Sequence, residues 1–365
     1  MDVVSSPSPN ELISIVMPAR NRSALIGASL DSVLAQTEQN WELIVVDDGS
    51  SDGTSDAVRS YQAKSGGRIR CVRNETNFGA AASRNRGFEE TRGDWIALLD
   101  SDDRWHTQHL AVLKHAANAT TADVVYSQVE MVDDSNGESL GTYGPSPEEL
   151  QDYPASMFQR SYVVPSVSMF HRTVLDRVGP WDHRYLYCED FDFWLRCVAA
   201  GVQFHHVPET TAIYRKAHAG ATTQKLAGTL EEVAHTIRRY INSGVCDDAT
   251  LRQYASTMFS ISAKEHRRPS SAGDQSADPQ RAALMLIHAW RLRPSKLDWL
   301  VKGTARFVSH RTKRLFAADE SKSRYVPVIQ KLAFLSPDAA AYRPWKTPSM
   351  STDASRSSAA SKRAA

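Results

Sequence analysis

The chain has 365 residues, 41% of them hydrophobic and 23% charged, which is an ordinary globular composition. Its formal net charge of +1 points to no class of partner, and its four cysteines lack the close spacing of metal ligands, so we expect reduced thiols in a cytoplasmic protein. We find neither a secretory signal nor a run of about 18 apolar residues, so we expect a protein that is soluble or bound peripherally at the cytoplasmic face of a membrane.

The first 128 residues alternate short apolar runs with stretches of helical periodicity. The apolar runs are rich in β-branched residues, and they are predicted strands at residues 12–17, 42–47, 68–72, 94–100 and 123–127. Between them apolar residues recur at helical spacing, as in the series Ile26, Leu30, Val33 and Leu34. This alternation predicts an α/β fold with a mostly parallel central sheet flanked by helices. Ligands of such sheets bind beyond the carboxyl ends of the strands.

Beyond residue 128 the pattern becomes irregular. Glycine and proline clusters appear, and we predict a strand at 164–171 and a helix at 189–201. Two short strands, 203–207 and 211–215, are predicted to form a hairpin that closes this unit near residue 216. Helix-forming residues dominate after that, up to a Ser/Ala-rich tail that we expect to be disordered.

Three carboxylates follow the fourth predicted strand, at Asp100, Asp102 and Asp103. Like charges this close repel one another, so a positive partner is expected among them. Hard oxygen ligands at a strand end suit Mg²⁺ or Mn²⁺, which also bind substrate phosphates. The alternative is that these aspartates cap the helix beginning near Thr107, although capping explains one aspartate more readily than three.

Two other strand and loop ends carry polar residues suited to a ligand. Asp47 and Asp48 end the second predicted strand, where a carboxylate can accept hydrogen bonds from a base or a ribose, or can merely cap a turn. A helix of small residues at 77–90 carries Arg84 and Arg86. An arginine on its first turns can meet a phosphate, and the alternative is a solvated arginine face.

A third acidic group begins the predicted helix at 189–201, with Glu189, Asp190 and Asp192 ahead of an aromatic face. Acidic residues are expected at a helix start, which explains Glu189 or Asp192 as capping residues. Asp190 is our candidate general base, because aromatic neighbours would desolvate its carboxylate and raise its pKa toward working range.

Five segments resemble, in order and spacing, the family 2 glycosyltransferases of the GT-A fold. They are ISIVMPARN, SVLAQTEQNWELIVVDDGSSDGT, NFGAAASRNRGFEETRGDWIALLDSDD, PSVSMFHRTVLDRVGPWD and CEDFDFWLRCVAAG. The resemblance implies a metal-dependent, inverting transfer of a sugar from a nucleotide-sugar donor, expected to be a UDP sugar. The acceptor would be a hydroxyl of a glycan, glycolipid or protein, in surface polysaccharide or glycoconjugate synthesis.

The resemblance covers about the first 220 residues, and together with the changes in composition along the chain it predicts a domain organisation. A flexible N-terminus (1–10) would precede a catalytic domain (11–220), itself divided into a nucleotide-binding half (11–128) and an acceptor half (129–220). A helical C-terminal region (221–346) and the disordered tail (347–365) would follow.

Residue by residue, the resemblance implies that the nucleotide base is contacted by Pro18, Ala19, Arg20 and Asp48, with Asp47 next to Asp48. Arg84 would reach the ribose or the phosphates of the donor.

The remaining assignments concern the metal and the chemistry. Asp102 would bind the divalent metal, and Asp100 the ribose or a metal-bound water. Asp190, paired with Glu189, would deprotonate the acceptor hydroxyl. The family often has a histidine near the metal; here His218 lies one position late after Arg215, so it is either a ligand or a surface histidine.

The segment 281–314 has nine Lys/Arg residues against one acidic residue, with apolar residues between them. Such a pattern predicts peripheral contact with a membrane, or else a helical cap on the catalytic domain with a basic rim. Nucleic acid is not an expected partner, because no binding module is recognisable.

Two alternatives to a glycosyltransferase remain at this point. A nucleotidyltransferase shares this architecture, but usually has a glycine-rich basic loop after the first strand, where this chain has PARNRSALIG. A catalytically inactive nucleotide-sugar-binding subunit would tolerate loss of Asp102 and Asp190, both of which are present.

Overall fold

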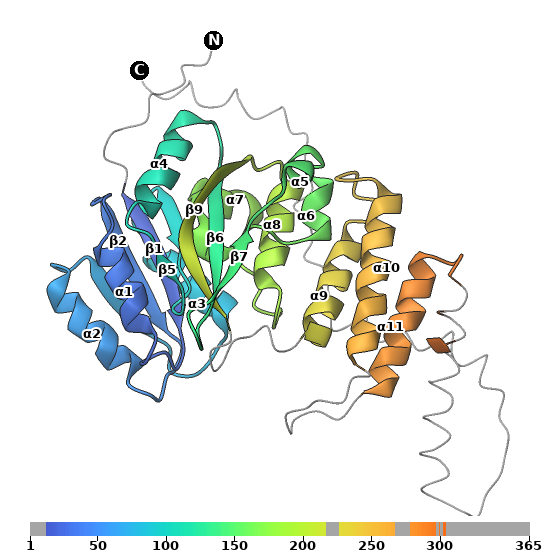
Figure 1. The fold of residues 1–365 in the computed structure, drawn as a ribbon, viewed down its shortest axis with the longest axis horizontal. Helices are drawn as coiled ribbons and strands as arrows, with labels where there is room; N and C mark the ends of the chain where they lie inside the picture. The colour runs from blue at the N-terminus through green and yellow to red at the C-terminus, as the bar shows by residue number, and fades with distance from the viewer. Residues whose placement is uncertain (1–11, 217–225, 267–277, 297–298, 300–301, 304–365) are drawn as a thin grey trace, which may run out of the picture. The chain divides into compact units, whose positions relative to one another are not determined.

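A mixed β-sheet organises the protein in the computed structural model, which describes residues 12–216, 226–266, 278–296, 299 and 302–303 (Figure 1). In spatial order its strands are β3 (Ile69–Arg73), β2 (Trp41–Asp47), β1 (Ile13–Ala19), β4 (Trp95–Leu98), β8 (Ser168–His171), β6 (Val124–Asp133), β9 (Phe204–Lys216) and β5 (Arg104–Trp105), with β7 (Ser139–Tyr143) on β6. The first four are parallel, as the alternating sequence pattern predicts. The antiparallel β8 then makes the other half of the sheet mixed.

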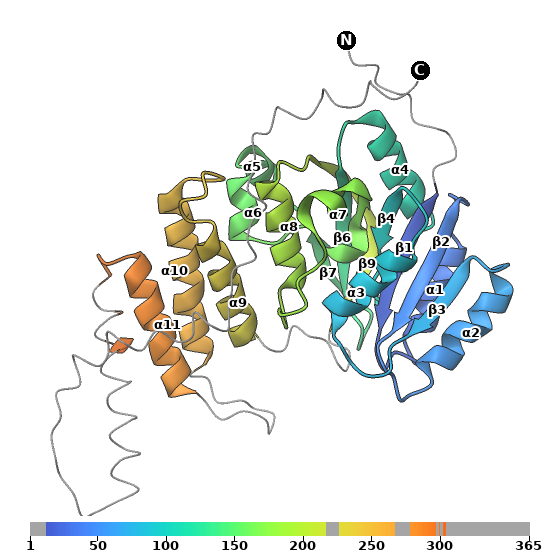
Figure 2. The same ribbon diagram turned by 180° about the vertical axis from the view of Figure 1, so that it is seen from behind.

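Helices cover both faces of this sheet (Figures 1 and 2). One face buries Ile13, Ile15 and Met17 under α1 (Ile26–Leu34), α2 (Thr54–Lys64) and α4 (His109–Ala119). The other face buries Val16 and Ile96 under α3 (Ala80–Glu90), α6 (Ala155–Gln159), α7 (Thr173–Val178) and α8 (Glu189–Ala199). A further short helix, α5 (Pro147–Gln151), precedes α6. Side chains of β1 thus alternate between two apolar cores, as expected for a strand buried on both sides.

The small residues of α3 let it lie very close to the sheet. A Cβ atom on Gly87 would stand 2.5 Å from Cγ1 of Val16, which is far inside van der Waals contact. This close approach holds the second half of α3 directly against β1 and β2.

The predicted hairpin at 203–215 is wrong, because these residues form the single strand β9. β9 runs parallel to β6, and the register between them shifts around Gln128 and Pro208. A proline lacks the N–H that a strand interior needs, so it is tolerated where the ladder is irregular. β5 pairs only with Ala212 and Ile213, so that among the described strands the first half of β9 forms a free edge.

Three helices follow the sheet: α9 (Leu226–Arg239), α10 (Asp248–Glu265) and α11 (Pro279–Leu292). Ile237 of α9 and Leu251 of α10 belong to the same core as α8, so this bundle packs on the helical layer that covers the sheet. The apolar face of α11 is buried in a smaller core with Phe259 of α10. The described part of 281–314 therefore uses its apolar face inside the bundle. Within the described residues, no helix is both long and apolar enough to cross a bilayer.

The domain boundary predicted at residue 220 stays a prediction. Residues 1–10, His218, the tail at 347–365 and most of 297–314 lie outside the described residues.

Glu231 ties the three helices together. Its buried carboxylate on α9 accepts a hydrogen bond from Nε of Arg281 at 2.8 Å, and Nε2 of His266 lies 3.4 Å from it. Burial alone would raise its pKa, but these partners outweigh burial and lower the pKa to about 2. Glu231 thus contributes stability above its unfolded pKa, and this stability is lost as pH falls from about 4.5 toward 2.

We expect Glu231→Gln to lower the free energy of unfolding at pH 7 by about 2 to 4 kcal/mol, because Arg281 and His266 lose their charged partner. Urea unfolding at several pH values measures this loss. The difference between wild type and variant should shrink as pH falls toward 3, and a difference independent of pH would contradict the assignment.

Candidate active site

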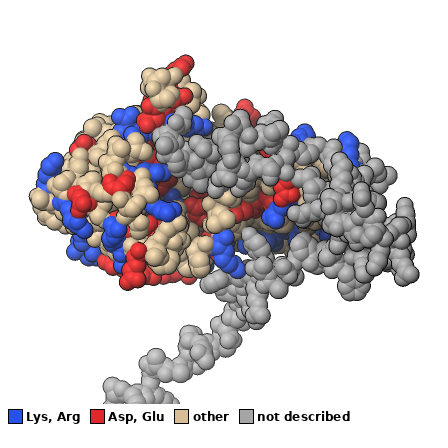
Figure 3. All heavy atoms as spheres, turned by 90° about the horizontal axis from the view of Figure 1, so that it is seen from below, with Lys and Arg blue, Asp and Glu red and all other residues tan. Residues whose placement is uncertain are grey.

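A pocket of about 250 Å³ lies where β1, β2, β4 and β9 end. Its walls come from six separate segments: Pro18, Ala19, Arg20 and Arg22; Asp48; Asn77, Gly79, Ala80, Ser83 and Arg84; Asp100, Ser101 and Asp102; Glu189; and Tyr214 and Arg215. β9 ends at the lower side of Figure 1, and Figure 3 views that side from below. Acidic side chains gather near the middle of this face, with basic side chains around them.

Most residues predicted for the site line this pocket. Eight of the eleven do so: Pro18, Ala19, Arg20, Asp48, Arg84, Asp100, Asp102 and Glu189. Asp190 is the neighbour of Glu189 without itself lining the pocket, Asp47 is directed elsewhere, and His218 lies outside the described residues.

Asp47 and Asp48 are adjacent but have different surroundings. The fully buried Asp47 accepts a hydrogen bond from the Ser50 N–H at 2.9 Å and pairs with Nη1 of Arg73 at 2.8 Å. Burial alone would raise the pKa of Asp47, but hydrogen bonds from Ser50 and Ser55 and the charge of Arg73 lower it. Asp47 therefore shapes the loop after β2, and it does not line the pocket.

Asp48 faces the pocket and is held by the start of α3. Its carboxylate accepts the N–H groups of Phe78 and Gly79, both at 2.9 Å, and Nδ2 of Asn74 at 2.8 Å. Gly49 makes the turn behind it with φ of +68°, and a Cβ there would stand 2.8 Å from the Thr76 backbone. Only glycine fits that position readily, so the loop orients Asp48 firmly.

Arg84 is the positive partner that the acidic cluster requires. Its buried guanidinium donates from Nη2 to Oδ1 of Asp100 at 2.6 Å and from Nη1 to Oε1 of Glu189 at 3.0 Å. It also lies 4.6 Å from the ring centroid of Trp181. Burial alone would lower the pKa of Arg84, but Asp100 and Glu189 outweigh it and raise the pKa above its ordinary value. Arg84 thus joins the acidic loop to the start of α8.

The other two aspartates of the cluster have different environments. Nη2 of Arg22 lies 3.3 Å from Oδ2 of Asp102 at the pocket wall. Asp103 is fully buried and accepts the Ser166 hydroxyl at 2.5 Å and the Arg215 N–H at 3.1 Å. Burial, with the charges of Asp102 and Asp100, raises the pKa of Asp103 well above its usual range. Asp103 therefore supports the loop from inside rather than facing a ligand.

The pocket residues fit a divalent cation that is shared with a donor. Asp100 and Asp102 both reach the pocket with part of their side chains accessible. Among the described residues, no three or more His, Cys, Asp or Glu side chains are grouped to hold a metal. Mg²⁺ commonly takes one or two carboxylates and completes its shell with water and substrate phosphates, which is what this arrangement allows.

Asp190 lies on the first turn of α8, where its Oδ1 accepts the Phe191 N–H at 2.7 Å. Phe193 and Trp194 behind it are fully buried. Burial, and then the neighbouring charge of Glu189, raise the pKa of Asp190 to about 7. A carboxylate with this pKa can accept a proton near neutral pH.

The sequence did not single out Arg22 and Tyr214 as pocket residues. Arg22 follows Arg20 by two positions in the same loop, and this closeness could have marked it as a pocket residue. Tyr214 reaches the pocket because β9 continues as one strand to the sheet end, which the hairpin prediction obscured.

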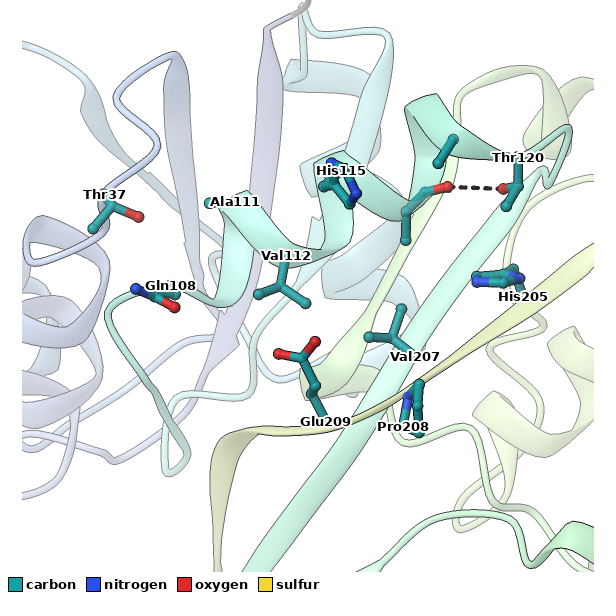
Figure 4. Close-up of a pocket in the computed structure, with 12 residues that line it drawn as sticks. Thr37, Gln108, Ala111, Val112, His115, Thr120, His205, Val207, Pro208 and Glu209 are labelled. Atoms are coloured by element: carbon teal, nitrogen blue, oxygen red, sulfur yellow. Dashed lines mark hydrogen bonds between the residues drawn. The ribbon is translucent and has the colours of Figure 1, made fainter.

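A larger pocket of about 600 Å³ lies between α4 and the free edge of β9 (Figure 4). His115 and Val112 of α4 and Val207, Pro208 and Glu209 of β9 line it. Among the described residues, its lining includes none of the predicted site residues and no arginine or lysine. The smaller pocket, with its arginines and carboxylates, has the chemistry that a nucleotide diphosphate needs.

Residues 14–179 match the sequence profile of Glycosyl transferase family 2. A relative, the UDP-Glc:alpha-D-GlcNAc-diphosphoundecaprenol beta-1,3-glucosyltransferase WfaP of Escherichia coli, is 31% identical over 58% of this chain and 80% of its own length. Among solved structures, S. aureus TarS 1-349 in complex with UDP-GlcNAc matches 87% of this chain and 95% of its own, with a TM-score of 0.59 and 16% identity. The mannosyltransferase PcManGT from Pyrobaculum calidifontis, in complex with GDP-Man and Mn2+, matches 87% and 91%, with a TM-score of 0.53 and 18% identity.

The two structural matches establish the fold, and the match to WfaP over most of its length establishes the family. This removes the nucleotidyltransferase alternative. The chain is a member of the family 2 glycosyltransferases, with the GT-A fold.

Proposed function

We propose that this enzyme transfers a sugar from a UDP sugar to a hydroxyl of a lipid-linked glycan, with inversion, in surface polysaccharide or glycoconjugate synthesis. The observation that carries the proposal is the pocket at the strand ends, where Asp48, Arg84, Asp102 and Glu189 converge from four separate segments. WfaP, as named, uses UDP-Glc and a diphosphoundecaprenol-linked acceptor, which supports both halves of the proposal.

The donor would lie with its base against Pro18, Ala19 and Arg20. Asp48 would accept a hydrogen bond from the base, because its carboxylate lines the pocket in a fixed orientation. Arg22 lies on the same wall and can pair with the diphosphate.

Asp102, with Asp100, would hold Mg²⁺ or Mn²⁺. When bound there, such a cation neutralises the charge that develops on a diphosphate leaving group. Arg84 keeps Asp100 in place and screens its charge from that of Glu189.

Asp190 would take the proton of the acceptor hydroxyl as that oxygen attacks the sugar. Glu189, fixed by Arg84, keeps the start of α8 in position and raises the proton affinity of Asp190. Attack from the side opposite the leaving group inverts the anomeric carbon, by the same geometric logic as in inverting glycosidases.

A panel of nucleotide sugars tests this function. Purified enzyme with Mn²⁺ or Mg²⁺ should show a thermal shift and slow hydrolysis with a UDP sugar, and less with GDP, ADP or TDP sugars. Stabilisation by a GDP sugar alone would overturn the UDP assignment, which matters because PcManGT is seen with GDP-Man. An absence of any donor response would count against an active enzyme.

The pKa of Asp190 predicts a pH profile. A general base works only when deprotonated, so kcat/KM should rise between about pH 6 and 8 and level off above. Initial rates at subsaturating acceptor measure this profile, with the thermal stability at each pH as a control. A wild-type profile that stays flat down to pH 5 would contradict the assignment.

A further inference from the structure

Large apolar side chains are exposed around the mouth of the pocket. In the described part of the chain six large apolar side chains are exposed in all, some near the pocket and some elsewhere: Phe78, Leu140, Leu150, Tyr153, Leu186 and Leu226. Phe78 lies between the pocket residues Asn77 and Gly79, and Leu186 precedes Glu189 by three positions. Leu226 begins α9.

Leu140 lies in β7 close to the end of β6, since Ser139 pairs with Val132. The end of β6 in turn pairs with the end of β9, at the side of the sheet where the pocket opens. Phe78, Leu140, Leu186 and Leu226 are named the apolar rim.

The segment that carries Leu186 is held firmly although its side chain is in solvent. The carboxylate of Glu232 on α9 accepts the Leu186 N–H at 3.1 Å and the Tyr187 N–H at 2.9 Å. The start of α9 packs on Tyr187 so closely that a Cβ on Gly228 would lie 2.7 Å from its ring. Leu186 is nevertheless 70% exposed, more than any other large apolar side chain of the described residues. Leu186 is therefore held in solvent by its backbone, and it carries weight only together with the other exposed apolar side chains near the pocket.

The chemistry of the rim fits a lipid surface. Its members lie on segments that adjoin or pack next to those of a polar pocket, so a polar headgroup can enter the pocket while the apolar part of the lipid contacts the rim. Arg20 is exposed at the pocket wall and Lys216 ends β9, which adds attraction for anionic headgroups. α11 offers no free apolar face for this purpose, because that face is buried in the bundle.

We propose that the apolar rim is the surface by which this enzyme docks on a membrane and receives its lipid-linked acceptor. This inference rests on the proposed function in taking the acceptor to be linked to a lipid. It places the membrane contact at the catalytic mouth rather than on the apolar face of α11.

Flotation with vesicles tests the rim. The full chain is mixed with vesicles of phosphatidylcholine and phosphatidylglycerol, and the floating fraction is measured for wild type and for Leu186→Ser combined with Leu226→Ser. We expect the variant's partition coefficient to fall by about tenfold or more, since two apolar contacts are lost. This loss should persist in high salt, because an apolar contact is not screened.

Leu150→Ser is the matched control. Leu150 is also an exposed leucine, but it lies on α5, away from the end of β9 in both views (Figures 1 and 2). The partition coefficient of the Leu150→Ser variant should stay within about twofold of that of wild type. Thermal unfolding checks that each variant is folded.

Two results would overturn the proposal: wild type that does not float with any vesicle, or a double variant that floats as well as wild type. Donor hydrolysis by the same preparations separates this failure from failure of the proposed function. If wild type hydrolyses a UDP sugar but does not float, only the proposal for the apolar rim fails. If it floats but responds to no donor, only the proposed function fails.

Discussion

Asp190→Asn should lower turnover by a factor on the order of 10² or more while leaving donor affinity close to that of wild type. The amide keeps the size and the hydrogen bond to the Phe191 N–H, but it cannot accept the acceptor's proton. Steady-state kinetics with saturating acceptor measures the turnover, and calorimetric titration with UDP and Mn²⁺ measures donor-site affinity. The pH dependence near 7 should disappear in this variant.

Asp192→Asn is the matched control, since it makes the same change two positions along α8. Asp192 is buried and pairs with Arg196 at 2.9 Å and with Arg239, away from the pocket. This variant should be less stable but should keep turnover within a few-fold of wild type at a temperature where it is folded. Near-normal turnover in Asp190→Asn would remove Asp190 from the role of base.

Arg84→Ala should lower the free energy of unfolding by about 3 to 5 kcal/mol and abolish transfer. Removing the buried guanidinium leaves Asp100 and Glu189 without their shared partner. Breaking a buried ion pair by removing one partner is strongly destabilising, because the remaining charges lose the group that offsets their burial. Urea unfolding followed by tryptophan fluorescence measures the loss of stability.

Two variants sharpen this test. Arg84→Lys should recover only part of the stability, because one ammonium group cannot reach both carboxylates as a guanidinium fork does. Arg86→Ala, two positions along α3, removes a half-buried arginine that bonds to Asn74 and the Arg73 carbonyl, and should cost no more than about 1 kcal/mol. Equal losses for Arg84→Ala and Arg86→Ala would contradict the central position of Arg84.

The strands β1, β2 and β4 could be predicted from the sequence because they are buried on both faces and therefore read as continuous apolar runs. The polar residues that follow those runs come together for a topological reason, since parallel strands end at the same edge of a sheet. Pro18, Asp48 and Asp102 are more than 80 positions apart from first to last, yet line one pocket.

Other features depend on contacts that no local pattern contains. The difference between Asp47 and Asp48 comes from which residue meets Arg73 and which meets the start of α3. The predicted hairpin at 203–215 is a single strand, and only the irregular pairing of β9 with β6 shows why Pro208 can lie within it. The burial of Asp103 depends on Ser166 and Arg215, both more than 60 positions away.

A crystal structure of the enzyme with UDP and Mn²⁺ tests the central claim most directly. Our account predicts the uracil ring against Pro18–Arg20 and Asp48, the metal on Asp102, and the side chain of Asp190 facing the open side of the diphosphate. Nucleotide bound between α4 and β9, beside His115 and Glu209, with the strand-end pocket empty, would contradict it.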